Sequence, residues 1–518
     1  MPNPASSDFE FSHRTRQQSW QQLKASQEIL NVLIIGGGIV GAGMAREFVI
    51  HGVKDVFLVE KNDFSSGTSS ASSKLIHAGI RYLELVWIKL KKGDISGAIT
   101  NLKFVIEASK ERKVLGFLAP HLVKPKPIYM VIGKGDPRSP WAAGLGTWLY
   151  YFIQVLQGQF FSPPSFYVRK TSIQNRFPAL NVNKVKAVFS FWDSETDDSR
   201  LVLDTLRSAS IDGAYCLNYV EVVFYKKEGD VFSVSLRNNE TNEIIFVKAK
   251  ILINAGGPFV DEIRKLNKNN KVPVSNLVDR VEGCHIDVFP KITEESYYVS
   301  AGDGRLIFVL KRNEDGFEYS RVGTTERVLS EGESSDGIHA TQKEIEYLLS
   351  SVREMFPQVD FDSRRKKNDA GIRPLRRQDE SNPFEKNREH DIIEEEGLFH
   401  VIGVKLTDFR RVAHELFKKI DWEKWGINIT RITSNISQEK PINPFQSTIS
   451  YPEKNMNDFI EKTMILHWDD YLRRRKGAKP LLEWGNETKL KEDFHILKTE
   501  MGWNEEDEKK EESRARGK

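Results

Sequence analysis

The chain has 518 residues, which predicts about two to four domains. Its hydrophobic fraction of 39% and charged fraction of 29% exclude wholesale disorder and collagen-like repeats. The net charge of +3 gives no indication of a nucleic-acid partner. The two cysteines, Cys216 and Cys284, are too few for a disulfide framework and suit a reducing compartment.

The two ends of the chain are expected to lie outside the main domains. Residues 13–29 read as a polar helix, so residues 1–29 are assigned to an N-terminal helix. Residues 504–518 form a charged segment whose single apolar residue is Ala515. Such a composition favours a solvated, disordered tail.

A glycine-rich turn follows the first apolar segment, residues 31–35 (NVLII), which is typical of a buried parallel strand. A helix over 42–51 would present its N-terminus to phosphates, and a second strand, 56–59, ends at Glu60, where an acid would bind a ribose. The glycines that satisfy G-x-G-x-x-G are Gly36, Gly38 and Gly41. This order of elements predicts a dinucleotide site but does not separate FAD from NAD.

The loop at residues 65–77 (SSGTSSASSKLIH) is rich in small hydroxyl side chains and favours FAD. Such a loop can approach a large flat cofactor closely and donate many hydrogen bonds. The alternative, a flexible serine-rich linker, fits poorly with the apolar residues that follow. The hydroxyl residues expected at the cofactor are Thr68, Ser69, Ser70, Ser72 and Ser73.

The segment 141–156 (WAAGLGTWLYYFIQVL) is apolar at 12 of 16 positions and lies within 30 residues that carry no charge. A spanning helix needs about 20 predominantly apolar residues, and Gly144 and Gly146 interrupt this one. A buried packing helix and a surface helix that dips into a membrane are the two main alternatives, and a true span is the third.

Several motifs in the same order resemble the FAD-dependent glycerol-3-phosphate dehydrogenases, the respiratory enzymes, over about residues 13–420. Residues 68–84 (TSSASSKLIHAGIRYLE) are similar to the signature of that family. Further similar segments are 119–122 (APHL), 197–203 (DDSRLVL), 254–258 (NAGGP), 323–326 (GTTE), 371–375 (GIRPL) and 403–407 (GVKLT). The chain departs from the family at Ala78 and Val404, where glycine is usual, and at Gly256 and Glu326, where Thr and Asp are usual.

The resemblance implies oxidation of sn-glycerol 3-phosphate to dihydroxyacetone phosphate by hydride transfer to FAD, with membrane quinone as the final electron acceptor. It implies that Arg81 and Lys405 bind the phosphate, since such cations match phosphate oxygens. Further substrate contacts that it implies are Tyr82, Thr407 and a second site arginine, Arg388.

Arg373 matches the family's arginine beside the substrate hydroxyl and would stabilise the alkoxide. His77 and His285 are both candidates for the base, because histidine titrates near neutral pH. The remaining cofactor contacts carried by the resemblance are Gly256, Gly403 and Lys405.

The expected fold class is α/β with α+β character: a Rossmann-like FAD domain of the glutathione-reductase and D-amino-acid-oxidase type, an antiparallel-sheet substrate domain and a helical C-terminal domain. The FAD domain is expected to be discontinuous, over 30–105, 181–274 and 366–418. The remaining expected domains are a substrate domain over 106–180 and 275–365 and the helical domain over 419–503.

A peripheral contact with membrane lipid is expected on the cytoplasmic, inner face of the cell membrane. The segment 85–103 and the run 473–476 (RRRK) are basic, as lipid-binding surfaces often are, although a solvated helix face is an equal alternative for each. The resemblance leaves room for a homodimer. No Cys/His spacing suits zinc, so no metal is expected.

Three other functions stay open at this stage. An oxygen-using glycerol-3-phosphate oxidase is the nearest alternative. An amine or amino-acid oxidase of the same fold would need a carboxylate site, whereas Arg81 and Lys405 suit a phosphate better. A non-catalytic, membrane-associated flavoprotein is the third.

Overall fold

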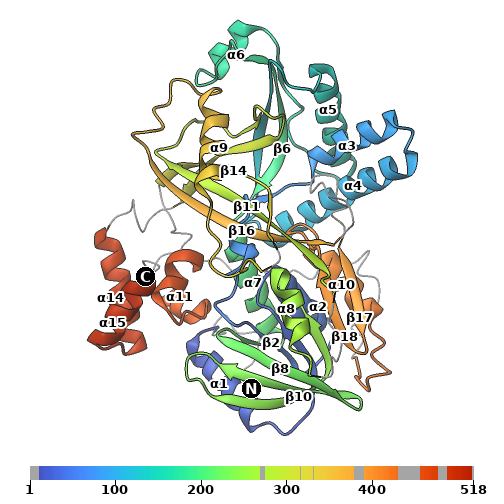
Figure 1. The fold of residues 1–518 in the computed structure, drawn as a ribbon, viewed down its shortest axis with the longest axis vertical. Coiled ribbons are helices and arrows are strands. Elements are labelled where there is room, and N and C mark those ends of the chain that lie inside the picture. Colours follow the sequence, from blue (N-terminus) through green and yellow to red (C-terminus); the bar gives the residue numbers. More distant parts are fainter. Residues whose placement is uncertain are drawn as a thin grey trace.

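The computed structural model describes residues 11–268, 275–314, 317–330, 332–377, 390–429, 456–475 and 487–515. Two large sheets organise the chain, and Figure 1 shows the first sheet in the lower half of the molecule and the second in the upper half. A helical C-terminal unit lies to one side of both. This is the expected α/β class, with a Rossmann-like first sheet.

The first sheet has the strand order β17-β18-β10-β1-β2-β7, and β8 and β9 extend it from β10. β1 pairs in parallel with both β10 and β2, as in a nucleotide-binding unit. Its strands are β1 (Leu30–Ile35), β2 (Val56–Val59), β7 (Tyr215–Leu217), β8 (Val220–Glu228), β9 (Val231–Asn238), β10 (Ile244–Asn254), β17 (Asp391–Glu395) and β18 (Leu398–Ile402).

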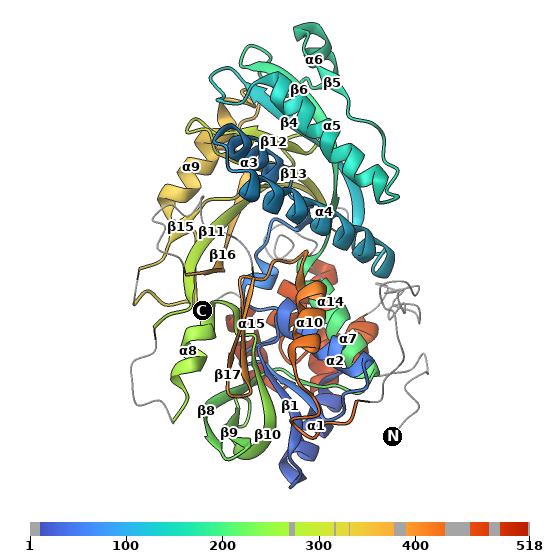
Figure 2. The ribbon, with the colours of Figure 1, turned by 90° about the vertical axis from the view of Figure 1, so that its right-hand side faces the viewer.

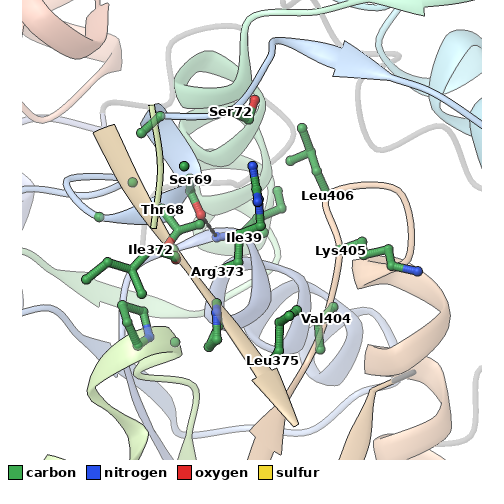
Figure 3. A pocket seen from close by; sticks show the side chains of 18 of the residues that line it. Ile39, Thr68, Ser69, Ser72, Ile372, Arg373, Leu375, Val404, Lys405 and Leu406 are labelled. Carbon is green, nitrogen blue, oxygen red and sulfur yellow. Dashed lines mark hydrogen bonds between the residues drawn. The ribbon is translucent and has the colours of Figure 1, made fainter. Parts of the chain in front are cut away.

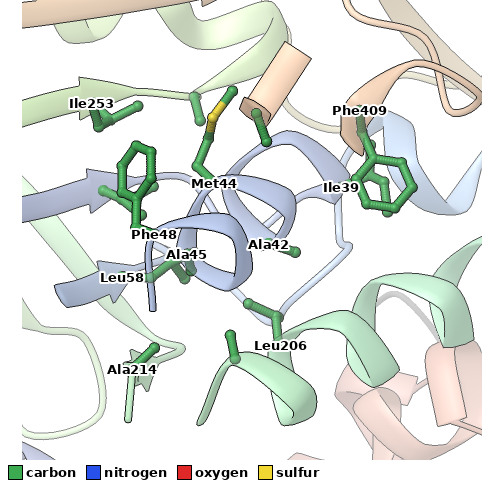
Figure 4. Close-up of a cluster of buried hydrophobic side chains, with 14 of the residues drawn as sticks. Ile39, Ala42, Met44, Ala45, Phe48, Leu58, Leu206, Ala214, Ile253 and Phe409 are labelled. Atoms are coloured by element: carbon green, nitrogen blue, oxygen red, sulfur yellow. The ribbon is translucent and has the colours of Figure 1, made fainter. Parts of the chain in front are cut away.

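Both faces of this sheet are buried, which explains why its central strands are apolar without alternation. One face packs on α2 (Ile39–Ile50), α7 (Asp198–Ile211) and α10 (Phe409–Lys419), and Figure 4 shows side chains of α2 such as Met44 and Phe48 in this core. The other face packs on α1 (His13–Ala25) and on the β8-β9 hairpin. The predicted N-terminal helix therefore covers the sheet.

The second sheet has the strand order β15-β11-β14-β13-β12-β4-β6-β3, with β16 paired to β11 and β5 to β6. Its strands are β3 (Leu75–Ile76), β4 (Lys124–Gly133), β5 (Phe166–Tyr167), β6 (Val185–Glu195), β11 (Val278–Phe289), β12 (Tyr297–Ser300), β13 (Leu306–Glu314), β14 (Phe317–Gly323), β15 (Arg327–Val328) and β16 (Arg365–Arg376). Most of its pairs are antiparallel, as expected for a substrate domain.

Three strands differ from the expected domain boundaries. β3, β6 and β16 fall in segments assigned to the FAD domain, yet all three belong to the second sheet. β6 pairs with β4 along ten residue positions and β16 pairs with β11 along twelve, so long antiparallel ladders hold these two there, and the short β3 pairs with β6. Short-range sequence patterns do not report which distant strand is the partner.

Helices cover both faces of the second sheet. Figures 1 and 2 both show α3 (Ile80–Lys91), α4 (Ile95–Leu118) and α5 (Pro140–Leu156) side by side, and they pack against one face of this sheet. The remaining helices are α6 (Lys170–Arg176), α8 (Val260–Lys265) and α9 (Gln342–Arg353), with 3-10 turns η1 (Thr68–Ser70) and η2 (Gly257–Phe259).

α5 is the apolar segment that raised the question of a membrane span. Tyr150 and Ile153 are buried in a core shared with β6, whereas the opposite face is open. The exposed apolar side chains of α5 are Trp141, Leu145, Trp148, Leu149, Phe152 and Leu156. Among the described residues, no helix is both long enough and apolar enough to cross a membrane.

The C-terminal unit packs around its own apolar cluster. Its elements are α11 (Met456–Lys462), α12 (Trp468–Asp470), the π-helical turn η3 (Tyr471–Arg475), α14 (Glu487–Met501) and α15 (Glu505–Ala515). α15 corrects the expected disordered tail. Glu511 is buried and accepts hydrogen bonds from His467 Nδ1 and from the Trp468 backbone N–H, each 2.8 Å long, which a charge count alone does not reveal.

The basic run 473–476 is also not the lipid-facing surface that was considered. Arg474 and Arg475 are buried and form ion pairs with Asp63, which follows β2 in the first sheet. These two arginines therefore attach the C-terminal unit to the first sheet. Lys476 lies outside the described residues.

Candidate functional site

One cavity of 1380 Å³ lies between the two sheets, at the carboxyl ends of β1 and β2. It is larger than the roughly 300–1,000 Å³ of ordinary small-molecule pockets, which leaves room for a dinucleotide and a substrate together. Figure 3 shows part of its wall, where Ser69 and Thr68 face the strand that carries Ile372 and Arg373.

The glycine turn at the start of α2 forms one end of the cavity. Gly36 has a φ of +118°, and a Cβ there would lie 2.5 Å from the carbonyl oxygen of Ala255. A Cβ on Gly41 would lie 1.9 Å from the carbonyl oxygen of Gly36. No other residue type fits these two positions, and Gly36 and Gly38 line the cavity.

Glu60 lines the same end of the cavity, directly after β2. Its carboxylate accepts hydrogen bonds from the backbone N–H of Gly37, at 2.8 Å, and of Asn62, at 2.9 Å. Burial raises the pKa of Glu60 above its ordinary value, although these two N–H groups act in the opposite direction. The acid is thus fixed beside the glycine turn, where a ribose would lie.

Every residue from 66 to 73 in the hydroxyl-rich loop lines the cavity. Ser69 Oγ accepts a hydrogen bond from the backbone N–H of Ile39, at 3.0 Å, and so joins the loop to the first turn of α2. Ser72 Oγ donates to Asp198, at 2.6 Å, and Ser73 Oγ lies 2.8 Å from His285 Nε2. Several of these hydroxyls therefore also hold the loop in place.

A buried ion-pair network fixes the end of this loop. Lys74 Nζ donates to Asp198, at 2.6 Å, from the loop to the start of α7. Burial alone would raise the pKa of Asp198, but Lys74 and Ser72 lower it below its ordinary value, so the carboxylate is ionised. Arg321 on β14 donates to the Ser72 carbonyl oxygen and to Asp287, which ties the loop to the second sheet.

Arg373 lines the cavity from β16. Its guanidinium donates to Thr324 Oγ1, at 2.8 Å, and pairs with Glu326, whose side chain is 7% exposed, at 3.3 Å. These two contacts hold the side chain at the cavity wall. Figure 3 shows Arg373 on the strand that borders the pocket. An arginine held in this way can stabilise negative charge that develops on a substrate oxygen.

His77 and His285 both line the cavity. His285 on β11 is buried, and its Nδ1 has no hydrogen-bond partner among the described residues. Burial and the charge of Arg321 lower the pKa of His285 well below its ordinary value, so the ring is neutral at pH 7. A neutral imidazole can accept a proton, but so low a pKa makes His285 a weak base, and its Nδ1 is enclosed by protein atoms.

The predicted phosphate ligands lie at another part of the cavity wall. Arg81 is the second residue of α3, and Lys405 precedes α10. The ammonium of Lys405 lies 3.6 Å from the centre of the Phe104 ring and 4.8 Å from that of Tyr82. In Figure 3 Lys405 extends away from Arg373, so the two cations mark different ends of the space.

All but one of the other predicted site residues lie at the cavity. Residues that also line it are Thr68, Ser70, Tyr82, Gly256, Gly403 and Thr407. Arg388 lies outside the described residues. Their roles stay predictions.

Residues that had no assigned role also shape the site. Thr324 and Glu326 hold Arg373, and Asp198 and Arg321 hold the serine loop. The segments GTTE and DDSRLVL contain three of them, so the motif match was the available signal. No local pattern marks Arg321, whose partners lie far away in sequence.

FAD fits these residues. Gly36 and Gly41 allow a turn too tight for any Cβ, and this turn brings backbone to the end of the cavity. Glu60 is fixed at the ribose end, and the serine loop and Arg373 also line the cavity. A family described as FAD dependent oxidoreductase matches residues 31–406.

Curated relatives agree with this match. The aerobic glycerol-3-phosphate dehydrogenase of Staphylococcus haemolyticus is 32% identical over 399 residues, which cover 75% of this chain and 66% of that protein. The protein of the same name from Staphylococcus aureus strain MRSA252 is 32% identical over 396 residues, covering 74% and 66%. The match thus spans just under two thirds of the length of these relatives.

Solved structures share the fold. The glycerol-3-phosphate dehydrogenase from Bacillus halodurans complexed with FAD has a TM-score of 0.70 at 22% identity and covers 98% of this chain and 97% of its own. The L-alpha-glycerophosphate oxidase from Mycoplasma pneumoniae with FAD bound has a TM-score of 0.54 at 16% identity, covering 76% and 96%. With the match over residues 31–406, the chain belongs to the FAD-dependent oxidoreductase family, and FAD is its cofactor.

Proposed function

We propose that this protein oxidises sn-glycerol 3-phosphate to dihydroxyacetone phosphate, with FAD as the hydride acceptor. The observation that carries the proposal is one cavity lined by the glycine turn, by Arg373, by both candidate histidines and by Arg81 and Lys405. The curated relatives named aerobic glycerol-3-phosphate dehydrogenase support the choice of substrate.

The phosphate of the substrate would bind at Arg81 and Lys405. Arg81 lies in the first turn of α3, which has no side-chain cap and whose N-terminus adds positive potential. Lys405 lies against Phe104 and Tyr82, which restrict the motion of its side chain. This end of the cavity suits a phosphate dianion better than a single carboxylate, which argues against an amino-acid substrate.

The hydroxyl end of the substrate would lie at Arg373. Bound FAD supplies a two-electron acceptor for the hydride that leaves C2. Arg373 would stabilise the alkoxide and then the carbonyl of the product, because Thr324 and Glu326 already fix its guanidinium. His77 and His285 remain the two candidate proton acceptors, because both line the cavity. The lowered pKa of His285 keeps its ring neutral but makes it a weak base.

Turnover with an artificial quinone tests the activity and the acceptor together. We expect the holoenzyme to reduce the quinone analogue when glycerol 3-phosphate is added, and to leave it oxidised with glycerol or with amino acids. Peroxide is measured in the same cuvette under air. Peroxide equal to the substrate consumed would replace the dehydrogenase with an oxygen-using oxidase, and the absence of any turnover would reject both.

We also propose that the enzyme binds the cytoplasmic face of the cell membrane peripherally, near the quinone pool. Six apolar side chains repeat along the open face of α5 at the helical period, and Trp141 is 90% exposed. α3 and α4 lie next to α5 and add Trp87, Leu90 and Ile95 to the exposed apolar surface. A contiguous apolar surface of this kind is typical of an interaction site, and tryptophan favours the lipid interface.

Liposome flotation tests this contact. We expect the wild-type protein to float with anionic vesicles, and the double substitution Trp141→Ser, Leu145→Ser to leave most of it at the bottom. Phe246→Ser is the matched control, because Phe246 is 70% exposed on β10 of the first sheet. Equal flotation of all three proteins would reject α5 as the contact. Light scattering on the protein without vesicles tests the predicted homodimer.

A further inference from the structure

Three metal-ligating side chains meet outside the cavity, where the end of α2 packs against α10. Glu47 and His51 lie one helical turn apart at the C-terminal end of α2, and His414 lies in the middle of α10. None of the three lines the cavity. The cluster is therefore separate from the site described above.

The distances within this cluster are short. His414 Nδ1 lies 2.8 Å from Glu47 Oε1, and His51 Nδ1 lies 3.5 Å from the same oxygen. One ligand atom from each of the three residues can be chosen so that all three lie within 4.8 Å of one another. Ligand atoms about 2.0–2.2 Å from one ion are separated by distances in this range.

The surroundings hold the ligands in place before any ion arrives. The His51 ring lies against Phe417, with ring centres 4.2 Å apart, and Phe417 packs on Trp422. His51 Nδ1 also lies 2.8 Å from the Glu47 carbonyl oxygen. This hydrogen bond holds the imidazole at the helix end while no ion is bound, and an ion at Nδ1 would take the place of its proton. Glu47 is buried, while the His414 side chain is 33% exposed and gives an ion access from solvent.

We propose that Glu47, His51 and His414 bind a divalent cation of the zinc class, with water at the remaining position. Two imidazoles and one carboxylate are a ligand set that zinc accepts with an open fourth position, and imidazole favours zinc, nickel and copper over magnesium or calcium. The ion would replace a proton on the imidazole hydrogen-bonded to Glu47.

Such an ion would connect the two helices that reach the cavity from the same side. α2 begins at the glycine turn and α10 begins just after Lys405, and Phe409 packs against Gly43 between them. The ion would therefore stabilise the folded protein without contacting substrate or FAD. The sequence spacing does not reveal the site, because the third ligand is 363 residues after His51.

Zinc titration of the full-length holoenzyme, freed of any histidine tag and treated with a chelator, tests the proposal. Calorimetry at pH 7.5 is run on the wild type, on Glu47→Gln and on His414→Asn. The matched control is His390→Asn, because His390 pairs with Glu415 on α10 but lies outside the cluster. We expect the wild type and the control to bind one equivalent.

Removing a residue that only hydrogen-bonds to a metal ligand lowers the metal affinity by roughly 10–100-fold. We expect the zinc affinity of each ligand variant to fall by more than this. The melting temperature gives a second readout: zinc should raise it in the wild type and in His390→Asn but not in His414→Asn, and magnesium and calcium should raise it in none. His414 is partly exposed, so its variant should keep bound flavin. A wild type that binds no zinc, or equal binding by all four proteins, would overturn the proposal.

Discussion

Replacing Asp63 with Asn should release the C-terminal unit from the first sheet. Asp63 is buried and accepts hydrogen bonds from Arg474, from Arg475 at 2.9 Å and from Asn218 at 3.0 Å. An amide at this position removes the charge and turns a donor toward the guanidinium groups.

The size of the free-energy change follows from the hydrogen-bond partners that each arginine retains. Arg474 retains Asp470, at 2.9 Å, whereas Arg475 retains the carbonyl oxygens of Thr463 and Met464. One buried cation is left without a counterion, which costs about 3–5 kcal/mol. Native-state hydrogen exchange of α14 and α15 should therefore become faster by roughly 100-fold or more, since about 1.4 kcal/mol corresponds to tenfold.

The matched control for Asp63→Asn is Glu107→Gln. Glu107 pairs with Lys110 on the exposed face of α4, at 2.9 Å, and such pairs contribute at most about 1 kcal/mol. Exchange in α14 and α15 should be unchanged in this variant. Equal exchange rates in Asp63→Asn and wild type would refute the view that the buried pairs attach the C-terminal unit.

Three further predictions concern FAD, pH and the substrate. Gly41→Val should be purified with little flavin, because its Cβ would lie 1.9 Å from the Gly36 carbonyl oxygen; an unchanged ratio of flavin to protein absorbance would contradict this. Burial lowers the pKa of His467, but Glu240 and Glu511 raise it to about 9, so the stabilisation of about 3 kcal/mol is complete below pH 6.5 and is lost as pH rises through 9. Thermal unfolding scans from pH 6 to 10 check it, and a flat profile between pH 6.5 and 9 would argue against it. Arg373→Ala should mainly lower the rate of flavin reduction, whereas Lys405→Ala should mainly raise the substrate concentration for half-saturation, and stopped-flow spectroscopy would expose the reverse assignment.

The nucleotide-binding half of the fold could be predicted because its signals are local. An apolar strand, a glycine turn and an acid after the second strand lie within about 30 residues, and the structure has β1, α2 and β2 there. The motif match then placed Arg373 and Lys405, which come from distant segments but line the same cavity.

Long-range partners explain what could not be predicted. The sequence of α15 is typical of a solvated tail, but in the structure Glu511 binds His467. The basic run near the C-terminus is typical of a lipid-binding surface, but Arg475 forms a buried ion pair with Asp63. Charged residues that are buried with a partner have the same sequence pattern as exposed ones. Arg321 could not be predicted either, because its partners Ser72 and Asp369 are distant in sequence.

We propose that this flavoprotein oxidises glycerol 3-phosphate, and flavin reduction by this substrate without oxygen tests the proposal most directly. The holoenzyme is mixed with glycerol 3-phosphate without oxygen or quinone, and the flavin absorbance is followed while dihydroxyacetone phosphate is measured. We predict bleaching of the oxidised flavin band and one product molecule per flavin reduced. A spectrum that stays oxidised at saturating glycerol 3-phosphate would contradict the account.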